Sequence, residues 1–204
     1  RSNLKVAFDN LADDQITPPG YAKTGGHIIV DIRMTLERKA RWVKDGHKTP
    51  EPDKLTYAGV VSRESVLISL TYAALNSIEA LACDIKNAYL QAPSSEKHYI
   101  ICGAEFGLEN IGKVALIRRA LYGGKMSGCD FWKHLRSCME HLGFKPCKAD
   151  SEIWMREAQK DNGQSYWEHV LLYVDDALCV SERGKHVLEK EIGRYFYIKE
   201  GSVG

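Results

Sequence analysis

The sequence predicts an α+β fold, in which strands and helices follow one another without regular alternation. Short apolar segments that favour strands recur from residue 27 to residue 180, and several are separated only by tight turns. Three longer segments carry helix signals and lie at irregular intervals among the strands. The composition, 44% hydrophobic and 27% charged over 204 residues, is that of a globular protein.

The N-terminal part is expected to be a loop-rich segment followed by two strands. Residues 1–26 end in the Pro/Gly-rich stretch TPPGYAKTGG, which is typical of a loop. Residues 27–34 and 39–46 then predict two short strands joined by a turn. No run of about 18 apolar residues occurs, and residues 1–15 lack the apolar core of a signal peptide, so we expect neither a membrane span nor secretion.

The clearest helix signal covers residues 62–76, with the sequence SRESVLISLTYAALN. Ser62 suits the N-cap and Glu64 the first turn, and Asn76 is a reasonable stop. The apolar spacing predicts that one face, made of Val66, Leu70 and Ala73/Ala74, is buried.

Residues 77–85 predict a strand in which Ala80, Ala82 and Asp84 share a face, because alternate side chains of a strand point the same way. Small residues beside Asp84 leave space around its carboxylate. The next expected elements are a short helical turn over 87–92, a strand over 97–102 and a strand leading into a glycine turn over 113–123.

A second helix is expected from Ser127 to Leu142. Ser127 and Asp130 resemble a capping box, and Gly143 suits the C-terminal end. The residues expected on its buried face are Phe131, Leu135, Cys138 and Leu142.

The C-terminal part predicts two strands, 151–158 and 167–174, on either side of a turn. The stretch YVDD should then form the tip of a second tight turn, with ALCV returning as the partner strand. A third helix is expected over residues 185–196.

Six cysteines show neither a CxxC pair nor zinc-finger spacing, so free thiols in a reducing compartment are expected. The net charge of +1 neither favours nor excludes a polyanionic partner. Residues 33–48 carry six Lys/Arg against two acids, and residues 113–136 carry six against one. Such stretches are either solvated faces or phosphate-contacting surfaces.

Two adjacent acids, Asp175 and Asp176, interrupt the apolar run LLYVDDALCV. Aspartate is a favoured turn residue, so an ordinary turn stays open as the explanation. A third acid, Asp84, ends another apolar strand. Three carboxylates at strand ends could share divalent cations, whose charge would offset the cost of desolvating the acids.

Four segments resemble motifs of copia-type retrotransposon reverse transcriptases. LLYVDDALCV is similar to the YxDD motif, and CDIKNAYLQA to the segment with the first catalytic aspartate. RKARWVKDGH and IRRALYGGKMSGCDFWKHL resemble the KARLVARG and LYGLKQAPRxW segments. Together they cover roughly residues 27–200 in the family's order.

The resemblance implies the fingers and palm of a right-hand polymerase, with an antiparallel palm sheet and packed helices; the thumb and RNase H regions are not matched. Fingers would cover about 27–60 and 92–122, and palm about 61–91 and 123–204.

The resemblance also assigns the catalytic residues. Asp84 and Asp175 match the two main ligands of two Mg²⁺ ions, with Mn²⁺ as a substitute, and Asp176 matches the third acid. Ile85 matches the residue whose backbone carbonyl joins the metal shell. The amides of Asn87 and Ala88 would lie near the triphosphate.

Tyr89 matches the steric gate, whose ring excludes a ribose 2′-hydroxyl. Lys39 and Arg41 match the fingers strand that reaches the triphosphate, and which of the two makes the contact stays open. Tyr122 and Gly123 match the turn against the nucleotide and template. In the same segment Met126 replaces a Gln and Gly128 a Pro of the family motif.

The family implies RNA or DNA template with primer and dNTPs as partners, and neighbouring polyprotein domains such as integrase and RNase H. It implies a cytoplasmic location in virus-like particles, with the nucleus as the alternative. Two other hypotheses stay open: a non-polymerising relic that binds nucleic acid or protein, and a Mg²⁺-dependent cyclase-like palm, which leaves KARWVKDGH unexplained.

Overall fold

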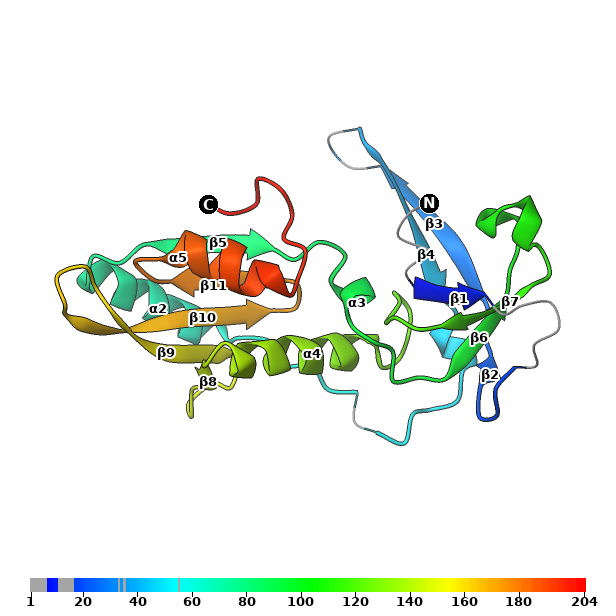
Figure 1. Cartoon of the computed structure of the whole chain (residues 1–204), viewed down its shortest axis with the longest axis horizontal. Coiled ribbons are helices and arrows are strands. Elements are labelled where there is room, and N and C mark those ends of the chain that lie inside the picture. The colour runs from blue at the N-terminus through cyan, green and yellow to red at the C-terminus, as the bar shows by residue number, and fades with distance from the viewer. Residues whose placement is uncertain (1–6, 11–16, 33, 35, 55) are drawn as a thin grey trace. The chain divides into compact units, whose positions relative to one another are not determined.

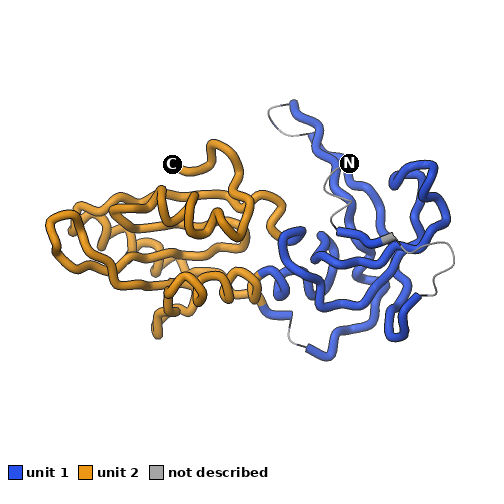
Figure 2. Tube along the Cα trace, viewed as in Figure 1, with its two compact units in different colours: residues 1–57, 89–131 blue, residues 58–88, 132–204 orange. Residues whose placement is uncertain are grey.

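The computed structural model describes residues 7–10, 17–32, 34, 36–54 and 56–204. The chain divides into two compact units, shown in two colours in Figure 2. Unit 1 comprises residues 1–57 and 89–131, and unit 2 comprises residues 58–88 and 132–204. The mixture of helices and sheets agrees with the α+β prediction.

Unit 1 contains a four-stranded sheet of order β1-β7-β6-β2 and a separate two-stranded sheet, β3-β4. The strands are β1 (Phe8–Asn10), β2 (Ala22–Lys23), β3 (Gly26–Ile32), β4 (Arg38–Lys44), β6 (His98–Ile101) and β7 (Val114–Ile117). Short 3-10 helices are η1 (Gly46–Lys48), η2 (Ala104–Phe106) and η3 (Leu108–Asn110).

The predicted pair of strands after residue 26 is confirmed as the antiparallel hairpin β3–β4. Its base is anchored by Trp42, whose ring makes edge contacts with Phe8 at 5.3 Å and Phe106 at 6.0 Å. Of the predicted loop-rich segment 1–26, residues 1–6 and 11–16 lie outside the described residues, and the expectation for the rest was incomplete, because β1 and β2 lie there. Phe8 is buried in the core of unit 1, which explains why its short segment is ordered as a strand.

Unit 2 is built on a five-stranded antiparallel sheet of order β5-β11-β10-β9-β8. The strands are β5 (Ala80–Asp84), β8 (Lys145–Pro146), β9 (Ile153–Gln159), β10 (Ser165–Tyr173) and β11 (Asp176–Val180). Among the described residues, the helices outside the 3-10 turns named above are α2 (Arg63–Leu75), α3 (Ala88–Gln91), α4 (Ser127–His141) and α5 (Gly184–His186), which continues as η4 (Val187–Glu191) and η5 (Ile192–Arg194).

Helices cover both faces of this sheet (Figure 1). Val66 of α2 packs with Leu171 and Leu178, which are register partners on one face. On the other face, α5 begins at Gly184 against Leu81 of β5. The segment predicted as a third helix, 185–196, is therefore helical but changes from α to π to 3-10 geometry.

Helix α2 begins and ends where predicted, because Ser62 accepts a hydrogen bond from the Ser65 N–H at 3.2 Å and Asn76 is the C-cap. The predicted buried face is wrong in part, since Leu70 and Ala74 are exposed and Val66 is only partly buried. The residues that the helix buries fully are Ser65, Ser69 and Ala73.

The predicted capping box of α4 is wrong. The Ser127 hydroxyl donates to the Leu121 carbonyl at 2.6 Å, and the Asp130 carboxylate accepts from the Ser95 N–H at 2.9 Å. Both side chains thus bind the preceding loops rather than the first turn of the helix. Gly143, with φ of 83°, follows the helix as expected.

All six cysteines are free thiols, as predicted. In the described part of the chain, none of the helices combines the length and the apolar character that crossing a membrane would need.

Candidate active site

The YVDD stretch forms the tip of the β10–β11 hairpin, as predicted. Tyr173 pairs with Asp176, which leaves Val174 and Asp175 as the two residues of the loop. Val174 has φ of 54°, and Asp175 does not have a positive φ. A positive φ at the first central residue alone is the pattern of a type II′ turn, which favours glycine there. A β-branched residue in this position is strained.

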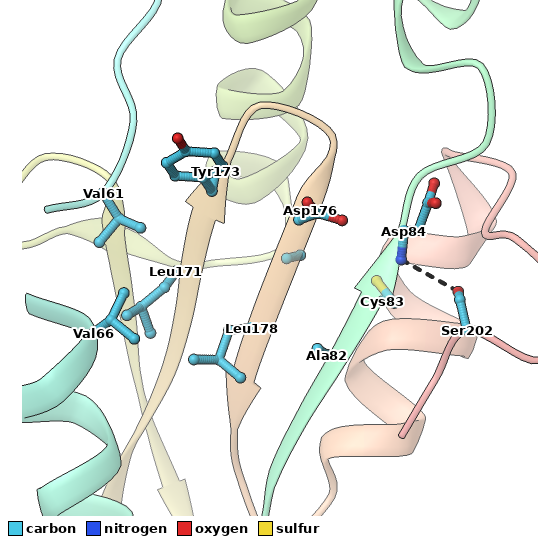
Figure 3. A pocket seen from close by; sticks show the side chains of 11 residues that line it. Val61, Val66, Ala82, Cys83, Asp84, Leu171, Tyr173, Asp176, Leu178 and Ser202 are labelled. Atoms are coloured by element: carbon cyan, nitrogen blue, oxygen red, sulfur yellow. Dashed lines mark hydrogen bonds between the residues drawn. The ribbon is translucent and has the colours of Figure 1, made fainter. Parts of the chain in front are cut away.

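The hairpin brings Asp176 opposite Asp84. The two residues are register partners of the antiparallel strands β11 and β5, so their side chains lie on the same face of the sheet, with Cβ atoms about 5 Å apart. The Ile85 N–H donates to the Asp175 carbonyl at 2.8 Å, which fixes the tip of the hairpin against the end of β5. Figure 3 shows Asp84 and Asp176 at neighbouring ends of these strands.

The three carboxylates repel one another. Partial burial raises the pKa of Asp176, and the charges of Asp175 and Asp84 raise it further. Lys199 acts in the opposite direction, and its ammonium group donates to Asp84 Oδ2 at 3.3 Å. The arrangement therefore favours the binding of positive charge near these acids.

An open pocket of about 400 Å³ lies next to the two facing acids (Figure 3). Asp84, Asp176 and the Ser202 hydroxyl line one end. The rest of the lining is largely apolar and includes Val61, Val66, Leu171, Tyr173 and Leu178. The apolar wall limits hydration on one side of the carboxylates, which agrees with the raised pKa of Asp176.

The donor set suits a hard divalent cation. Asp84, Asp175 and Asp176 offer carboxylate oxygens, the ligands that Mg²⁺ prefers. The neighbouring Cys83 is no competing ligand, because burial and the charges of Asp176 and Asp84 raise the pKa of its thiol to about 11. Among the described residues, no three His, Cys, Asp or Glu side chains are already close enough together to form a metal-binding cluster.

The predicted nucleotide-binding residues divide between the two units. Asn87 and Ala88 follow β5 in unit 2, where Asn87 adopts a left-handed backbone with φ of 51°. Lys39, Arg41, Tyr89, Tyr122 and Gly123 belong to unit 1.

Three of the unit 1 residues lie together. The Tyr89 and Tyr122 rings are 5.0 Å apart, and the Arg41 guanidinium lies 5.4 Å from the centroid of the Tyr122 ring. Lys39 and Arg41 are two residues apart on β4, so their side chains point to the same face of the hairpin. Lys39 is the register partner of Asp31. Both cations therefore lie on one face of the hairpin, and the geometry does not distinguish which of them would contact a triphosphate.

The Tyr122–Gly123 turn packs directly on the end of β4. The Lys44 N–H donates to the Tyr122 carbonyl at 2.7 Å. Gly123 has φ of 83°, and a Cβ there would lie 2.2 Å from the Lys44 carbonyl oxygen, so the approach requires glycine. Of the two residues that differ from the family motif, Met126 is buried in unit 1 and Gly128 lies in the first turn of α4.

Sequence reasoning missed Lys199 and Ser202. The Asp84 N–H donates to Ser202 Oγ at 3.2 Å, and the Lys199 N–H donates to the Asp84 carbonyl at 2.9 Å. These contacts arise because residues 197–204 lie along the outer edge of β5. No motif in the C-terminal stretch YIKEGSVG signals this pairing.

Comparisons with known proteins point to one family. The profile of the family described as reverse transcriptase (RNA-dependent DNA polymerase) matches residues 27–200. The chain is 26% identical over 216 residues to the retrovirus-related Pol polyprotein from transposon RE2 of Arabidopsis thaliana, covering 98% of the chain and 14% of that protein. It is 26% identical over 191 residues to the corresponding polyprotein from transposon RE1, covering 87% and 12%. The chain therefore spans about one seventh or less of the length of these relatives.

Proposed function

The chain belongs to the reverse transcriptase (RNA-dependent DNA polymerase) family, and on that basis we propose that it extends a DNA primer on an RNA template with dNTPs, as part of a copia-type retrotransposon polyprotein. One observation carries the proposal: Asp176 and Asp84 face each other across β11 and β5, at the tip that also holds Asp175. Repelling carboxylates at a strained turn are typical of functional sites rather than of ordinary hairpins.

In this proposal Asp84, Asp175 and Asp176 would hold two Mg²⁺ ions, and the Ile85 carbonyl would contribute a further oxygen. Bound ions of this kind activate the attacking hydroxyl and stabilise the leaving oxygen in phosphoryl transfer. The primer 3′-hydroxyl attacks the α-phosphate of the dNTP, and pyrophosphate leaves. The fixed backbone of the hairpin tip keeps the carboxylates of Asp175 and Asp176 in place during this step.

Unit 1 would supply the fingers and unit 2 most of the palm. Arg41 or Lys39 would bind the triphosphate and offset the charge that develops on pyrophosphate. The ring of Tyr89, supported by Tyr122, would exclude the 2′-hydroxyl of a ribonucleotide. In the unit 2 segment, the amides of Asn87 and Ala88 would contact the triphosphate.

The names of the two relatives, both Pol polyproteins of transposons, suggest that further domains accompany this one in the complete element. We propose integrase and RNase H among them. The hydrolytic and integration chemistry would then reside outside the residues considered above.

Primer extension tests the proposal. The chain is incubated with a labelled DNA primer on an RNA template, dNTPs and Mg²⁺, and Asp175→Asn is expected to lower extension at least about 100-fold, as the loss of one key electrostatic group typically does. Asp161→Asn is the matched control, because it removes the same charge from an exposed turn between β9 and β10. Equal extension by the Asp175→Asn variant and the wild type contradicts the assignment.

A further inference from the structure

The C-terminal segment places a cation on a proposed metal ligand. Lys199 Nζ donates to Asp84 Oδ2 at 3.3 Å. We propose that Lys199 is a tethered counter-ion, which neutralises Asp84 when no metal is bound and releases it to a divalent cation. The inference rests on the proposed function, since it takes Asp84 as a metal ligand.

Main-chain contacts hold Lys199 beside Asp84. The Lys199 N–H donates to the Asp84 carbonyl at 2.9 Å, and Ile198 forms an antiparallel bridge with Ile85. The Ser202 hydroxyl accepts from the Asp84 N–H and donates to the Lys199 carbonyl at 2.7 Å. Because the backbone of Lys199 is fixed, its ammonium group stays within reach of the carboxylate whether or not the pair is formed.

The ion pair is suited to being displaced. The Lys199 and Asp84 side chains are 51% and 39% exposed, and exposed pairs contribute little to stability. A divalent ion carries twice the charge of one ammonium group, so the three carboxylates attract it more strongly. Lys199 thus relieves the repulsion around Asp84 without closing the site.

Lys199 weakens metal binding in two ways. Its ammonium group competes for Asp84 Oδ2, and its positive charge repels an approaching cation. Removing the charge should therefore strengthen metal binding, by about tenfold for a unit charge a few ångströms from a divalent ion in a water-like medium. In the metal-free protein, the same change leaves the acids without their counter-ion and, because an exposed ion pair contributes little to stability, lowers the melting temperature only slightly.

Titration of Mn²⁺ into the purified chain, followed by electron paramagnetic resonance of the free ion, tests the proposal. Lys199→Gln is expected to lower the dissociation constant about tenfold, and Lys199→Arg to restore the wild-type value. Lys190→Gln is the matched control, because it removes the same charge from an exposed position on η4. The melting temperature should fall in Lys199→Gln without metal and show a larger increase with Mn²⁺ than in the wild type.

The outcomes separate the two proposals. If wild-type Mn²⁺ binding is unaffected by Asp84→Asn, the metal site and the proposed function are both wrong. If binding depends on Asp84 but Lys199→Gln binds Mn²⁺ equally or more weakly, only the counter-ion role is overturned. Tighter binding in Lys199→Gln together with wild-type binding in Lys190→Gln supports the role.

Discussion

Replacing Val174 by glycine should give a more stable chain than replacing it by alanine, although glycine inside a strand is normally the less stable of the two. Val174 is the first central residue of the β10–β11 turn and has φ of 54°, which a β-branched side chain tolerates poorly. The perturbation removes the Cβ atom that causes this strain and leaves the two flanking strands unchanged.

The magnitude follows from two opposing contributions. A left-handed backbone costs a residue with a Cβ about 1–2 kcal/mol. The greater flexibility of glycine in the unfolded chain costs about 0.5–1 kcal/mol relative to alanine. Since Val174→Ala keeps the strain and Val174→Gly removes it, the glycine variant should be more stable than the alanine variant by about 0.5–1 kcal/mol.

Urea denaturation of the two variants measures the difference. Val60 is the matched control, because it is also an exposed valine of unit 2, pairs with Tyr173 in an isolated bridge, and lacks a positive φ. At Val60, glycine should be less stable than alanine by about 0.5–1 kcal/mol. The same order of stability at both positions would refute the strain at Val174. In primer extension, Val174→Gly should be slower than Val174→Ala, because Asp175 is held less firmly.

Three further predictions concern the two units. Glu168→Leu should cost about 1–3 kcal/mol in urea denaturation, because Arg156 loses the fully buried carboxylate that it binds at 2.7 Å while it keeps Glu191 at 2.8 Å. Arg183→Gln, which removes an exposed partner of Glu168 at 3.4 Å, should cost less than about 1 kcal/mol. Equal costs of the two substitutions would contradict this assignment. Burial opposes ionisation of Asp150, but hydrogen bonds from the start of α2 hold its pKa below the usual value. The Asp150 carboxylate therefore stabilises the folded chain above its unfolded-state pKa of about 3.9, and this stabilisation is lost as the pH falls through the lower folded-state pKa. The difference in unfolding free energy between the wild type and Asp150→Asn should narrow below about pH 4. A difference that does not change with pH would contradict this role of Asp150. Tyr89→Ala should raise the ratio of rNTP to dNTP incorporation in primer extension by at least about tenfold. An unchanged ratio would show that Tyr89 is not the steric gate.

The hairpin tip was predictable because its signals are local. Two acids interrupt an apolar run, and a second apolar segment follows at once, so a tight turn at YVDD required no knowledge of distant residues. The register of Asp176 with Asp84 was not predictable in the same way. It depends on pairing between β5 and β11, which are distant in sequence, and only the family resemblance suggested it.

Helix α2 shows why its packing could not be predicted from periodicity. Its limits follow from Ser62 and Asn76, which are local signals. Its apolar residues, however, lie almost all round the helix, so the pattern does not select one face. The folded chain instead buries Ser65 and Ser69 and leaves Leu70 exposed, and the Ser65 hydroxyl donates to Asp150 Oδ2 at 2.7 Å, a residue distant in sequence.

The contact between Lys199 and Asp84 had no sequence signal either. It arises from main-chain pairing of the C-terminal segment with β5, to which no side-chain pattern contributes. The roles assigned to Asp84, Asp175, Asp176 and Tyr89 stay predictions, which the kinetic experiments address.

The most direct test is incorporation of a single nucleotide on an RNA template. The chain is given a primed RNA template, Mg²⁺ and each dNTP separately, and the one-nucleotide product is measured. We predict product with the complementary dNTP for the wild type and at least about a 100-fold lower rate for Asp84→Asn. Absence of product with every dNTP, or equal rates for the two proteins, would contradict the proposal that these acids catalyse DNA synthesis.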